Sequence, residues 1–353
     1  MPAILNFPSS SKIYKEPYGT VLIISPWNYP YQLAFVPLIG AIAAGNTAVV
    51  KPSELTPNTS KITREIIETV FDNKYVSVIE GGIQVSTELL KQRWDYIFFT
   101  GSVQVGKIVA KAAAQFLTPV TLELGGKNPC IIDETANIKL ATKRIVWGKL
   151  INGGQTCIAP DYLLIHASVK DEFIECYQKE VTNAYGENPE NSKDYPRIVN
   201  QRNFDRLAIM LKNEKILIGG KTNREDNYIS PTLIDEPSLD SEVMKGEIFG
   251  PISPILSYQS EEDLHSIISN YQKPLALYVF TGKKNFANKM IATYSFGGGT
   301  INDTTVHFAN HNLPFGGVGE SGVGAYHGKQ TFDVFCHKKG VTKRYNWLDI
   351  PVR

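Results

Sequence analysis

The chain is poor in cysteine and has no dominant sign of charge. Only four cysteines occur among 353 residues, at positions 130, 157, 176 and 336. Isolated cysteines without a C-x-x-C pair argue against a disulfide framework and a structural zinc site, and they fit a reducing compartment. The six histidines have no metal-ligand spacing, so no metal is expected. The 36 basic and 35 acidic residues nearly cancel, which gives no electrostatic footprint for nucleic acid.

Long apolar runs are also missing. The longest covers residues 33–44, is interrupted by Pro37, and is much shorter than the ~20 residues that span a bilayer. The opening residues Met1–Asn6 contain no charged leader before an apolar stretch. We therefore expect a cytoplasmic protein without a membrane anchor.

The first third of the chain alternates strand-like and helix-like segments. Apolar strands are predicted at 20–24, 47–50, 76–79, 96–99 and 120–124. Helices are predicted at 32–44, from Thr56-Pro57 onward, at 84–91 and at 101–116. Repeated strand–helix units predict a parallel, Rossmann-type sheet with helices on both faces. A second α/β region should follow Gly125-Gly126 and extend to about Phe335, so the fold class is α/β with two domains.

A glycine-rich approach to one cysteine is the most informative segment. The sequence GGQTCIAP occupies 153–160 and contains Cys157. Glycines let backbone N–H groups approach a reacting carbonyl, and cysteine is the best side-chain nucleophile. Glu123 lies on an apolar strand, where an ionised carboxylate needs a partner or a purpose. The pair suggests covalent chemistry on a carbonyl, although Cys157 could be a small buried hydrophobe and Glu123 could form a structural salt bridge.

Further candidates lie where predicted strands end, the edge at which α/β sheets bind ligands. Asn28, in the turn PWNYP, could donate its amide to an oxyanion or merely cap the turn. Lys51 and Glu54, in KPSE, could bind ribose hydroxyls or form a solvated loop. Gly101, Ser102 and Gly106 open a helix whose N–H groups could face a pyrophosphate, or form a plain strand–helix turn.

The segment EIFGP at 247–251 combines a carboxylate, an aromatic ring and a rigid turn. Glu247 could hold a ribose and Phe249 could flank a planar cofactor, or both could simply end a loop. Tyr29, Trp147 and Phe249 suggest an apolar entrance for a substrate, although Trp147 could equally belong to the core.

Taken together, these segments resemble the NAD(P)-dependent aldehyde dehydrogenase superfamily, and its class 3, fatty-aldehyde-type branch in particular. Seven motifs occur in the family's order: PWNYP (26–30), KPSE (51–54), FTGS (99–102), LELGGK (122–127), GQTCIAPDY (154–162), EIFGP (247–251) and LPFGGVGESGVGAYHG (313–328). The resemblance extends over essentially the whole chain. Relatives carry a further N-terminal helical segment, which this chain is expected to lack, together with the membrane tail of the fatty-aldehyde branch.

The resemblance implies a role for each candidate residue. Cys157 would attack the aldehyde carbon, with the Asn28 amide and the Cys157 N–H holding the oxyanion. Hydride transfer to NAD or NADP would leave a thioester, which water activated by Glu123 would hydrolyse. Residues implied to bind the cofactor are Lys51, Glu54, Gly101, Ser102, Gly106, Glu247 and Phe249. Four parts are expected: an oligomerisation hairpin (1–17), an N-terminally truncated NAD(P)-binding domain (18–124), a catalytic domain (125–335) and a C-terminal oligomerisation segment (336–353).

Three rival hypotheses stay open at this point. The chain could be a weakly active or inactive truncated fragment that acts at most as an oligomerisation partner. It could carry out CoA-acylating aldehyde oxidation, against which Glu123 argues because a water activator competes with CoA. A Cys–His hydrolase would need a histidine beside Cys157 and no nicotinamide. The leading expectation is a homodimeric enzyme that oxidises small-molecule aldehydes, and neither the aldehyde nor the choice between NAD and NADP follows from the sequence.

Overall fold

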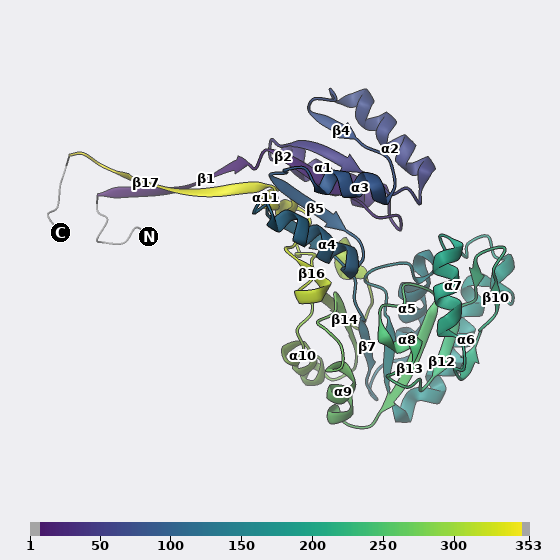
Figure 1. Cartoon of the computed structure of the whole chain (residues 1–353). Helices are drawn as coiled ribbons and strands as arrows, with labels where there is room; N and C mark the ends of the chain where they lie inside the picture. The colour runs from purple at the N-terminus through teal and green to yellow at the C-terminus, as the bar shows by residue number, and fades with distance from the viewer. Residues whose placement is uncertain (1–7, 348–353) are drawn as a thin grey trace.

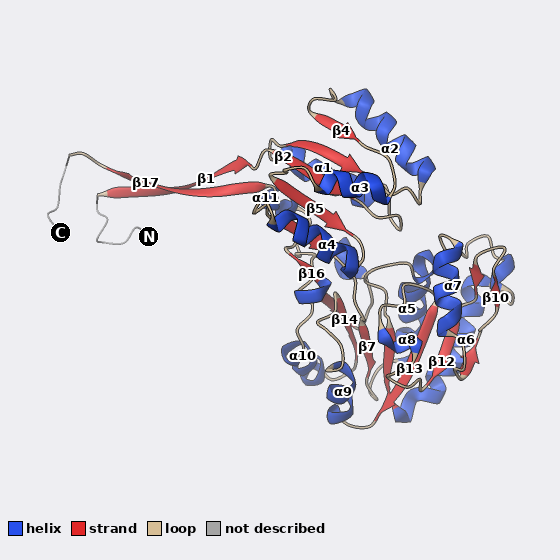
Figure 2. Ribbon diagram, viewed as in Figure 1, coloured by secondary structure: helices blue, strands red, loops and turns tan. Residues whose placement is uncertain are grey.

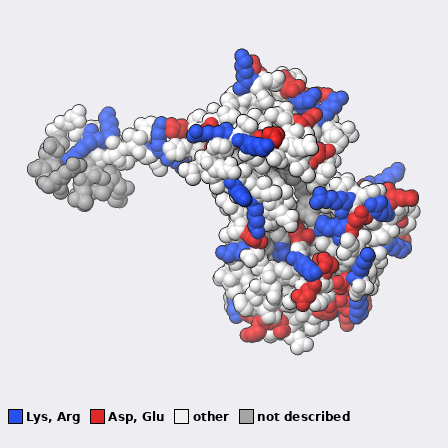
Figure 3. All heavy atoms as spheres, viewed as in Figure 1, with Lys and Arg blue, Asp and Glu red and all other residues white. Residues whose placement is uncertain are grey.

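The structure is a computed structural model that describes residues 8–347. Two α/β lobes lie side by side, and a long two-stranded ribbon projects from the first of them (Figure 1). Helices cover the sheets of both lobes (Figure 2). The α/β class with parallel sheets is therefore confirmed. Acidic and basic side chains are mixed over the face shown in Figure 3, in line with the balanced charge of the sequence.

The first lobe contains a six-stranded sheet in the order β16-β6-β5-β2-β3-β4, and only β16 runs antiparallel to its neighbour. Its strands are β2 (Thr20–Ile24), β3 (Thr47–Lys51), β4 (Val76–Val78), β5 (Tyr96–Thr100), β6 (Val120–Glu123) and β16 (Gly322–Val323). The helices between them are α1 (Gln32–Ala43), α2 (Pro57–Val70), α3 (Ile83–Leu90) and α4 (Val103–Ala114). Each strand and helix predicted in this region is confirmed to within a few residues.

Successive side chains of β2 pack into different cores, so this sheet is covered on both faces. Val21 and Ile23 belong to a core with α1 and α2, whereas Leu22 and Ile24 belong to another with α3 and α4. Successive side chains of a strand point to opposite faces, so a continuously apolar strand is buried on both sides.

The second lobe contains a seven-stranded sheet in the order β15-β14-β7-β8-β13-β12-β9, in which only β9 is antiparallel. Its strands are β7 (Pro129–Ile132), β8 (Tyr162–His166), β9 (Ile216–Ile218), β12 (Thr232–Asp235), β13 (Ile252–Tyr258), β14 (Ala276–Phe280) and β15 (Gly298–Ile301). Its helices are α5 (Ile138–Leu150), α6 (Lys170–Tyr185), α7 (Gln201–Met210), α8 (Glu242–Lys245), α9 (Glu261–Ile268) and α10 (Lys284–Thr293). A small hairpin pairs β10 (Thr222–Asn223) with β11 (Tyr228–Ile229).

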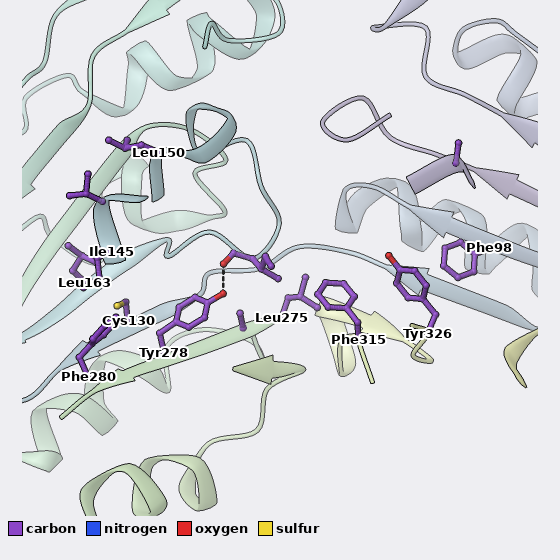
Figure 4. Close-up of a cluster of buried hydrophobic side chains, with 14 of the residues drawn as sticks. Phe98, Cys130, Ile145, Leu150, Leu163, Leu275, Tyr278, Phe280, Phe315 and Tyr326 are labelled. Carbon is purple, nitrogen blue, oxygen red and sulfur yellow. Dashed lines mark hydrogen bonds between the residues drawn. The ribbon is translucent and has the colours of Figure 1, made fainter. Parts of the chain in front are cut away.

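One core is continuous between the lobes. Phe280 and Tyr278 from β14 lead through Leu275 and Phe315 to Tyr326 and then to Phe98 of the first sheet (Figure 4). Rings at this junction pack edge to face, with centroids 5.8 Å apart for Phe315 and Tyr326 and 5.2 Å apart for Phe98 and Tyr326. The sheets are therefore held in a fixed relation.

The ribbon, which we call the β-arm, consists of β1 (Ser9–Pro17) and β17 (Cys336–Arg344), paired antiparallel along their full length. It extends away from both lobes (Figure 1), and Ile13 is 71% exposed. Residues 1–7 and 348–353 of the predicted oligomerisation segments lie outside the described residues. Helix α11 (Lys329–Val334) joins the arm to the first lobe by packing on α1.

Three expectations differ from the structure. Strand β16 joins the first sheet, although it falls inside the predicted catalytic domain of residues 125–335, because the chain crosses back between the lobes before it reaches the β-arm. The domain limits stay a prediction. In α2, Thr56 occupies the N-cap position but its hydroxyl donates to the Ser53 carbonyl instead of accepting from the helix. Helical spacing of four apolar residues in α2 predicts a buried face, but only Ile67 is buried, whereas Ile62, Ile66 and Val70 are exposed.

A single buried amide ties three connections of the first lobe together. Asn46, which is fully buried, donates to the carbonyls of Ala41 (3.1 Å) and Phe335 (3.0 Å) and accepts from the Gly19 N–H (3.0 Å). Replacing Asn46 with alanine leaves these backbone groups without that partner, and each unsatisfied buried group costs about 1–3 kcal/mol. We expect Asn46→Ala to lower the free energy of unfolding by at least ~2 kcal/mol in urea titrations. The exposed Asn73→Ala is the control, and equal stability of the two variants would contradict this.

Candidate active site

The loop that carries Cys157 is shaped by three consecutive left-handed residues. After α5, Asn152, Gly153 and Gly154 adopt φ values of 52°, 61° and 75°. A β-carbon on Gly154 would lie 2.2 Å from the Gly250 carbonyl oxygen. Glycine is required there because the loop passes directly against the backbone that follows Glu247. The glycine-rich approach thus turns the chain sharply and allows two segments to touch.

Two side chains from the second lobe hold the far side of this loop. Asn128, which is 1% exposed, donates to the carbonyls of Cys157 (2.8 Å) and Ala159 (3.0 Å) and accepts from the Ala276 N–H (2.8 Å). Tyr278 donates its hydroxyl to the Ile158 carbonyl at 2.5 Å, the dashed line in Figure 4. The backbone around the thiol is therefore fixed by buried hydrogen bonds.

The PWNYP turn contacts the same loop from the first lobe. The Asn28 amide donates to the Gln155 carbonyl at 3.0 Å, and Asn152 donates to the Asn28 carbonyl at 2.9 Å. Tyr29 shares a hydrogen bond of 2.7 Å with the Thr156 hydroxyl. Because an amide nitrogen carries two hydrogens, Asn28 keeps one donor beyond its bond to Gln155. Asn28 is thus hydrogen-bonded to the residue that precedes Cys157 by two positions, and its contacts are not confined to its own turn.

Glu123 is the last residue of β6, between Thr100 of β5 and Gly322 of β16. It is 2% exposed, and neither carboxylate oxygen has a hydrogen-bond partner within residues 8–347. Burial raises the pKa of Glu123 well above its ordinary value. No cation among the described residues pairs with it, so the salt-bridge alternative is wrong. A buried, unpaired carboxyl group costs stability, which is typical of a group retained for chemistry.

The thiol and two carboxylates influence one another electrostatically. Burial raises the pKa of Cys157 to about 12, and the negative charges of Glu247 and Glu123 act in the same direction. Hydrogen bonds from backbone N–H groups of the loop oppose this rise. The structure therefore brings Cys157, Glu123 and Asn28 together around one loop, with Glu247 as a further neighbour.

The Glu247 side chain lies against Gly125 and Gly126, the glycine pair that follows β6. A β-carbon on Gly125 would lie 2.3 Å from each of its carboxylate oxygens, and the Gly126 N–H donates to the carboxylate. Burial raises the pKa of Glu247 to about 8, helped by Asp161 and opposed by the Gly126 N–H, Arg206 and Lys127. The neighbouring Phe249 has a positive φ of 51° and packs edge to face on Trp27 at 5.4 Å between centroids.

The remaining candidates occupy the carboxyl edge of the first sheet. Lys51 ends β3 and pairs with Glu54 at 2.8 Å. Ser102 caps α4 by accepting from the Val105 N–H at 3.4 Å. Gly101 and Gly106 have packing roles, because β-carbons there would lie 2.5 Å from the Phe99 ring and 2.6 Å from the Leu124 side chain. The first turn of α4 contains no acidic residue, so no side-chain negative charge of that turn opposes an anion at the helix N-terminus.

Burial describes the positions of the other three cysteines and of Trp147. All four cysteines are free thiols; Cys130 and Cys336 are buried, and Cys176 is partly buried. Trp147 is 52% exposed, so its core alternative is wrong. Within residues 8–347, no helix combines the length and apolar character that a bilayer crossing requires.

Sequence reasoning missed Asn128, Tyr278, Asp161 and Arg206. Asn128 directly follows the LELGGK motif, which was its only signal. Asp161 lies inside the GQTCIAPDY motif, four residues after Cys157, but received no role of its own. Tyr278 and Arg206 lie on separate segments and become neighbours of the site only through folding.

Comparison with known proteins identifies the family of the chain. Residues 5–341 match the model of the aldehyde dehydrogenase family. The chain is 55% identical over 335 residues to the 4,4'-diaponeurosporen-aldehyde dehydrogenase of Staphylococcus aureus, covering 94% of this chain and 73% of that protein. It is 48% identical to aldehyde dehydrogenase family 3 member A2 of Rattus norvegicus, covering 95% and 69%. It is 47% identical to the dimeric NADP-preferring aldehyde dehydrogenase of Canis lupus familiaris, covering 92% and 72%.

Solved structures show the same similarity. The substrate-bound state of Staphylococcus aureus AldH superimposes with a TM-score of 0.97 at 52% identity, covering 100% of this chain and 77% of that one. A Mycobacterium tuberculosis aldehyde dehydrogenase complexed with NAD+ gives 0.85 at 29% identity, covering 94% and 70%.

Fold and sequence similarity together define an oxidoreductase that acts on the aldehyde group. The chain belongs to the aldehyde dehydrogenase family.

The raised pKa of Cys157 predicts sluggish alkylation near neutral pH. The thiolate is the reactive form, so its fraction should grow steadily with pH up to the raised pKa. We expect the rate of iodoacetamide alkylation at Cys157, followed by mass spectrometry, to keep rising from pH 7 to beyond pH 9. Glu123→Gln removes one negative neighbour and should shift the profile to lower pH. Cys157→Ser gives the background from the other cysteines, and a plateau by pH 8 would contradict this prediction.

Proposed function

We propose that Cys157, Glu123 and Asn28 carry out NAD(P)+-dependent oxidation of an aldehyde to a carboxylic acid. The observation that carries this assignment is Glu123, a buried carboxyl group with no hydrogen-bond partner that acts electrostatically on the Cys157 thiol. A group with a raised pKa near a nucleophile is suited to accept a proton from water at neutral pH. Membership of the family supports the overall reaction.

The chain's residues divide the reaction into two halves. The Cys157 thiolate adds to the carbonyl carbon, and the resulting alkoxide is held by the free Asn28 N–H and the Cys157 N–H. When bound, NAD+ or NADP+ supplies the hydride acceptor, which leaves an acyl thioester on Cys157. Glu123 then takes a proton from water, whose oxygen attacks the acyl carbon. The C–S bond breaks, and the acid and a free thiol are released.

The carboxyl edge of the first sheet fits a dinucleotide. Lys51 and Glu54 form a polar pair suited to ribose hydroxyls, and the α4 N-terminus after Gly101 presents N–H groups to an anion. Glu247 and Phe249 lie next to the Cys157 loop, where Glu247 would hold the nicotinamide ribose and Phe249 would flank the ring. The M. tuberculosis relative is complexed with NAD+ and the dog relative prefers NADP, so both nucleotides are candidates for this chain.

Single substitutions separate the two halves. We expect Cys157→Ser to abolish NADH formation nearly completely. Glu123→Gln should retain a pre-steady-state burst of one NADH per active site, while its steady-state kcat falls by about 10²–10⁴-fold, the range typical of a general base. Stopped-flow absorbance with medium-chain and aromatic aldehydes, each with NAD+ and NADP+, measures both quantities.

Controls for this experiment are Cys176→Ser and the exposed Glu225→Gln, which should behave as wild type. Loss of the burst in Glu123→Gln would count against the division of labour. Wild-type protein that produces no reduced nucleotide with any aldehyde would overturn the proposed function.

We also propose that the β-arm joins two copies in a homodimer. Among residues 8–347, no helix or other sheet lies against either face of its strands beyond the root near α11, and Ile13 is 71% exposed at its centre. Light scattering after size exclusion should give twice the 39.2 kDa chain mass. Ile13→Asp should reduce the mass to that of one chain, whereas the exposed Ile291→Asp should not. A monomeric wild-type protein would exclude the dimer.

A further inference from the structure

A buried ion pair holds the backbone on both sides of Glu247. Lys127 and Asp161 pair at 2.5 Å with both side chains 4% exposed. Lys127 also donates to the carbonyls of Val243 (2.9 Å) and Gly246 (3.0 Å). The second carboxylate oxygen of Asp161 accepts from the Ile248 N–H at 2.8 Å. Every donor of Lys127 and both oxygens of Asp161 are therefore engaged at this one place.

Arg206, on α7, holds the same backbone from another side. Its guanidinium donates to the carbonyls of Glu247 (3.3 Å) and Ile248 (2.7 Å). We call Lys127, Asp161 and Arg206 the charged clamp. Four backbone groups of three consecutive residues, the carbonyls of 246, 247 and 248 and the N–H of 248, are bound by charged side chains.

The segment needs this restraint because its own geometry is unfavourable. Phe249 has a left-handed φ of 51°, which an aromatic residue adopts only when its surroundings impose it. The Glu247 carboxylate is fitted over Gly125 with no room for a β-carbon. A small shift of the backbone would move the carboxylate away from both Gly126 and Cys157.

A purely structural role is the natural alternative for a buried ion pair, since such pairs often contribute little net stability. In this protein the hydrogen bonds of all three charged residues converge on the segment 243–248, and Asp161, Arg206 and Lys127 each affect the pKa of Glu247. That convergence favours a role in placing Glu247.

We infer that the charged clamp is a set of positioning residues that fixes Glu247 for the nucleotide. The inference rests on the proposed function, in which Glu247 binds the nicotinamide ribose. Loss of the clamp should weaken nucleotide binding while leaving the thiol and its base intact. Hydrolysis of p-nitrophenyl acetate without nucleotide requires only Cys157, Asn28 and Glu123, so its rate reports whether the thiol and its base are intact.

The experiment compares Arg206→Met with Arg206→Lys. Two charge-assisted hydrogen bonds are lost in the first variant, and one donor group is restored in the second. We expect Arg206→Met to raise the Kd for NAD+, measured by isothermal titration calorimetry, and the KM for NAD+ by about 10–100-fold. Arg206→Lys should recover part of that loss. Ester hydrolysis should stay within about twofold of wild type in both.

Arg202→Met, an exposed arginine one turn earlier on α7, is the matched control and should bind NAD+ as wild type does. The double variant Lys127→Met/Asp161→Leu tests the ion pair without leaving one buried charge unpaired, and it should also raise the Kd for NAD+. Thermal unfolding followed by circular dichroism verifies that each variant is folded.

Two results would overturn the inference: an unchanged Kd for NAD+ in both Arg206→Met and the double variant, or a parallel fall of ester hydrolysis and NAD+ binding. The proposed function fails separately, if wild-type protein binds NAD+ but oxidises no aldehyde. In that case the Kd series still decides whether the clamp positions the nucleotide site.

Discussion

The desolvation of Glu123 is the constraint on which the rest of the site depends. Its carboxyl group lies at the end of a buried strand, between two other strands, without a hydrogen-bond partner among the described residues. A polar group in that position costs free energy, and the surrounding sheet has to be stable enough to retain it. The continuous apolar strands of the first sheet, covered on both faces, supply that stability. The same burial raises the pKa of Glu123. The pKa of the Cys157 thiol is raised by its own burial first, and the charges of Glu247 and Glu123 add to that rise.

Each lobe contributes what the other lacks. In the first lobe, Lys51 and Glu123 end the parallel strands β3 and β6, and Asn28 lies in the turn after β2, so the polar groups gather at one edge of the sheet. The second lobe provides the Cys157 loop, held by Asn128 and Tyr278. The proposed mechanism uses both sets. The hydrogen bonds of Asn28 and Tyr29 to residues 155 and 156 join the two sets.

Much of this architecture could be predicted from the sequence, and there are physical reasons why the rest could not. Strands such as 20–24 and 96–99 are recognisable because burial on both faces requires unbroken apolar runs. Cys157 and Glu123 stand out because each is a reactive residue in a context that does not need it for packing. Asn128 and Asp161 lie in or beside quoted motifs, and Arg206 lies in none, but the backbone groups that they bind are distant in sequence and could not be predicted from it. The packing of Gly106 on Leu124 could not be predicted either, because it depends on how α4 lies against β6 and the residue after it.

The exposure of Ile62 and Val70 on α2 likewise could not be predicted from the sequence pattern. Helical spacing of apolar residues indicates a face suited to burial, and it says nothing about whether this chain supplies the surface that covers it.

The aromatic junction from Tyr278 through Phe315 and Tyr326 to Phe98 has a consequence for how the molecule melts. Because no solvent layer divides the two sheets there, neither half can lose its interior while the other keeps its own intact. Heat should therefore unfold both lobes in one cooperative transition, and only the β-arm should be able to fray before it.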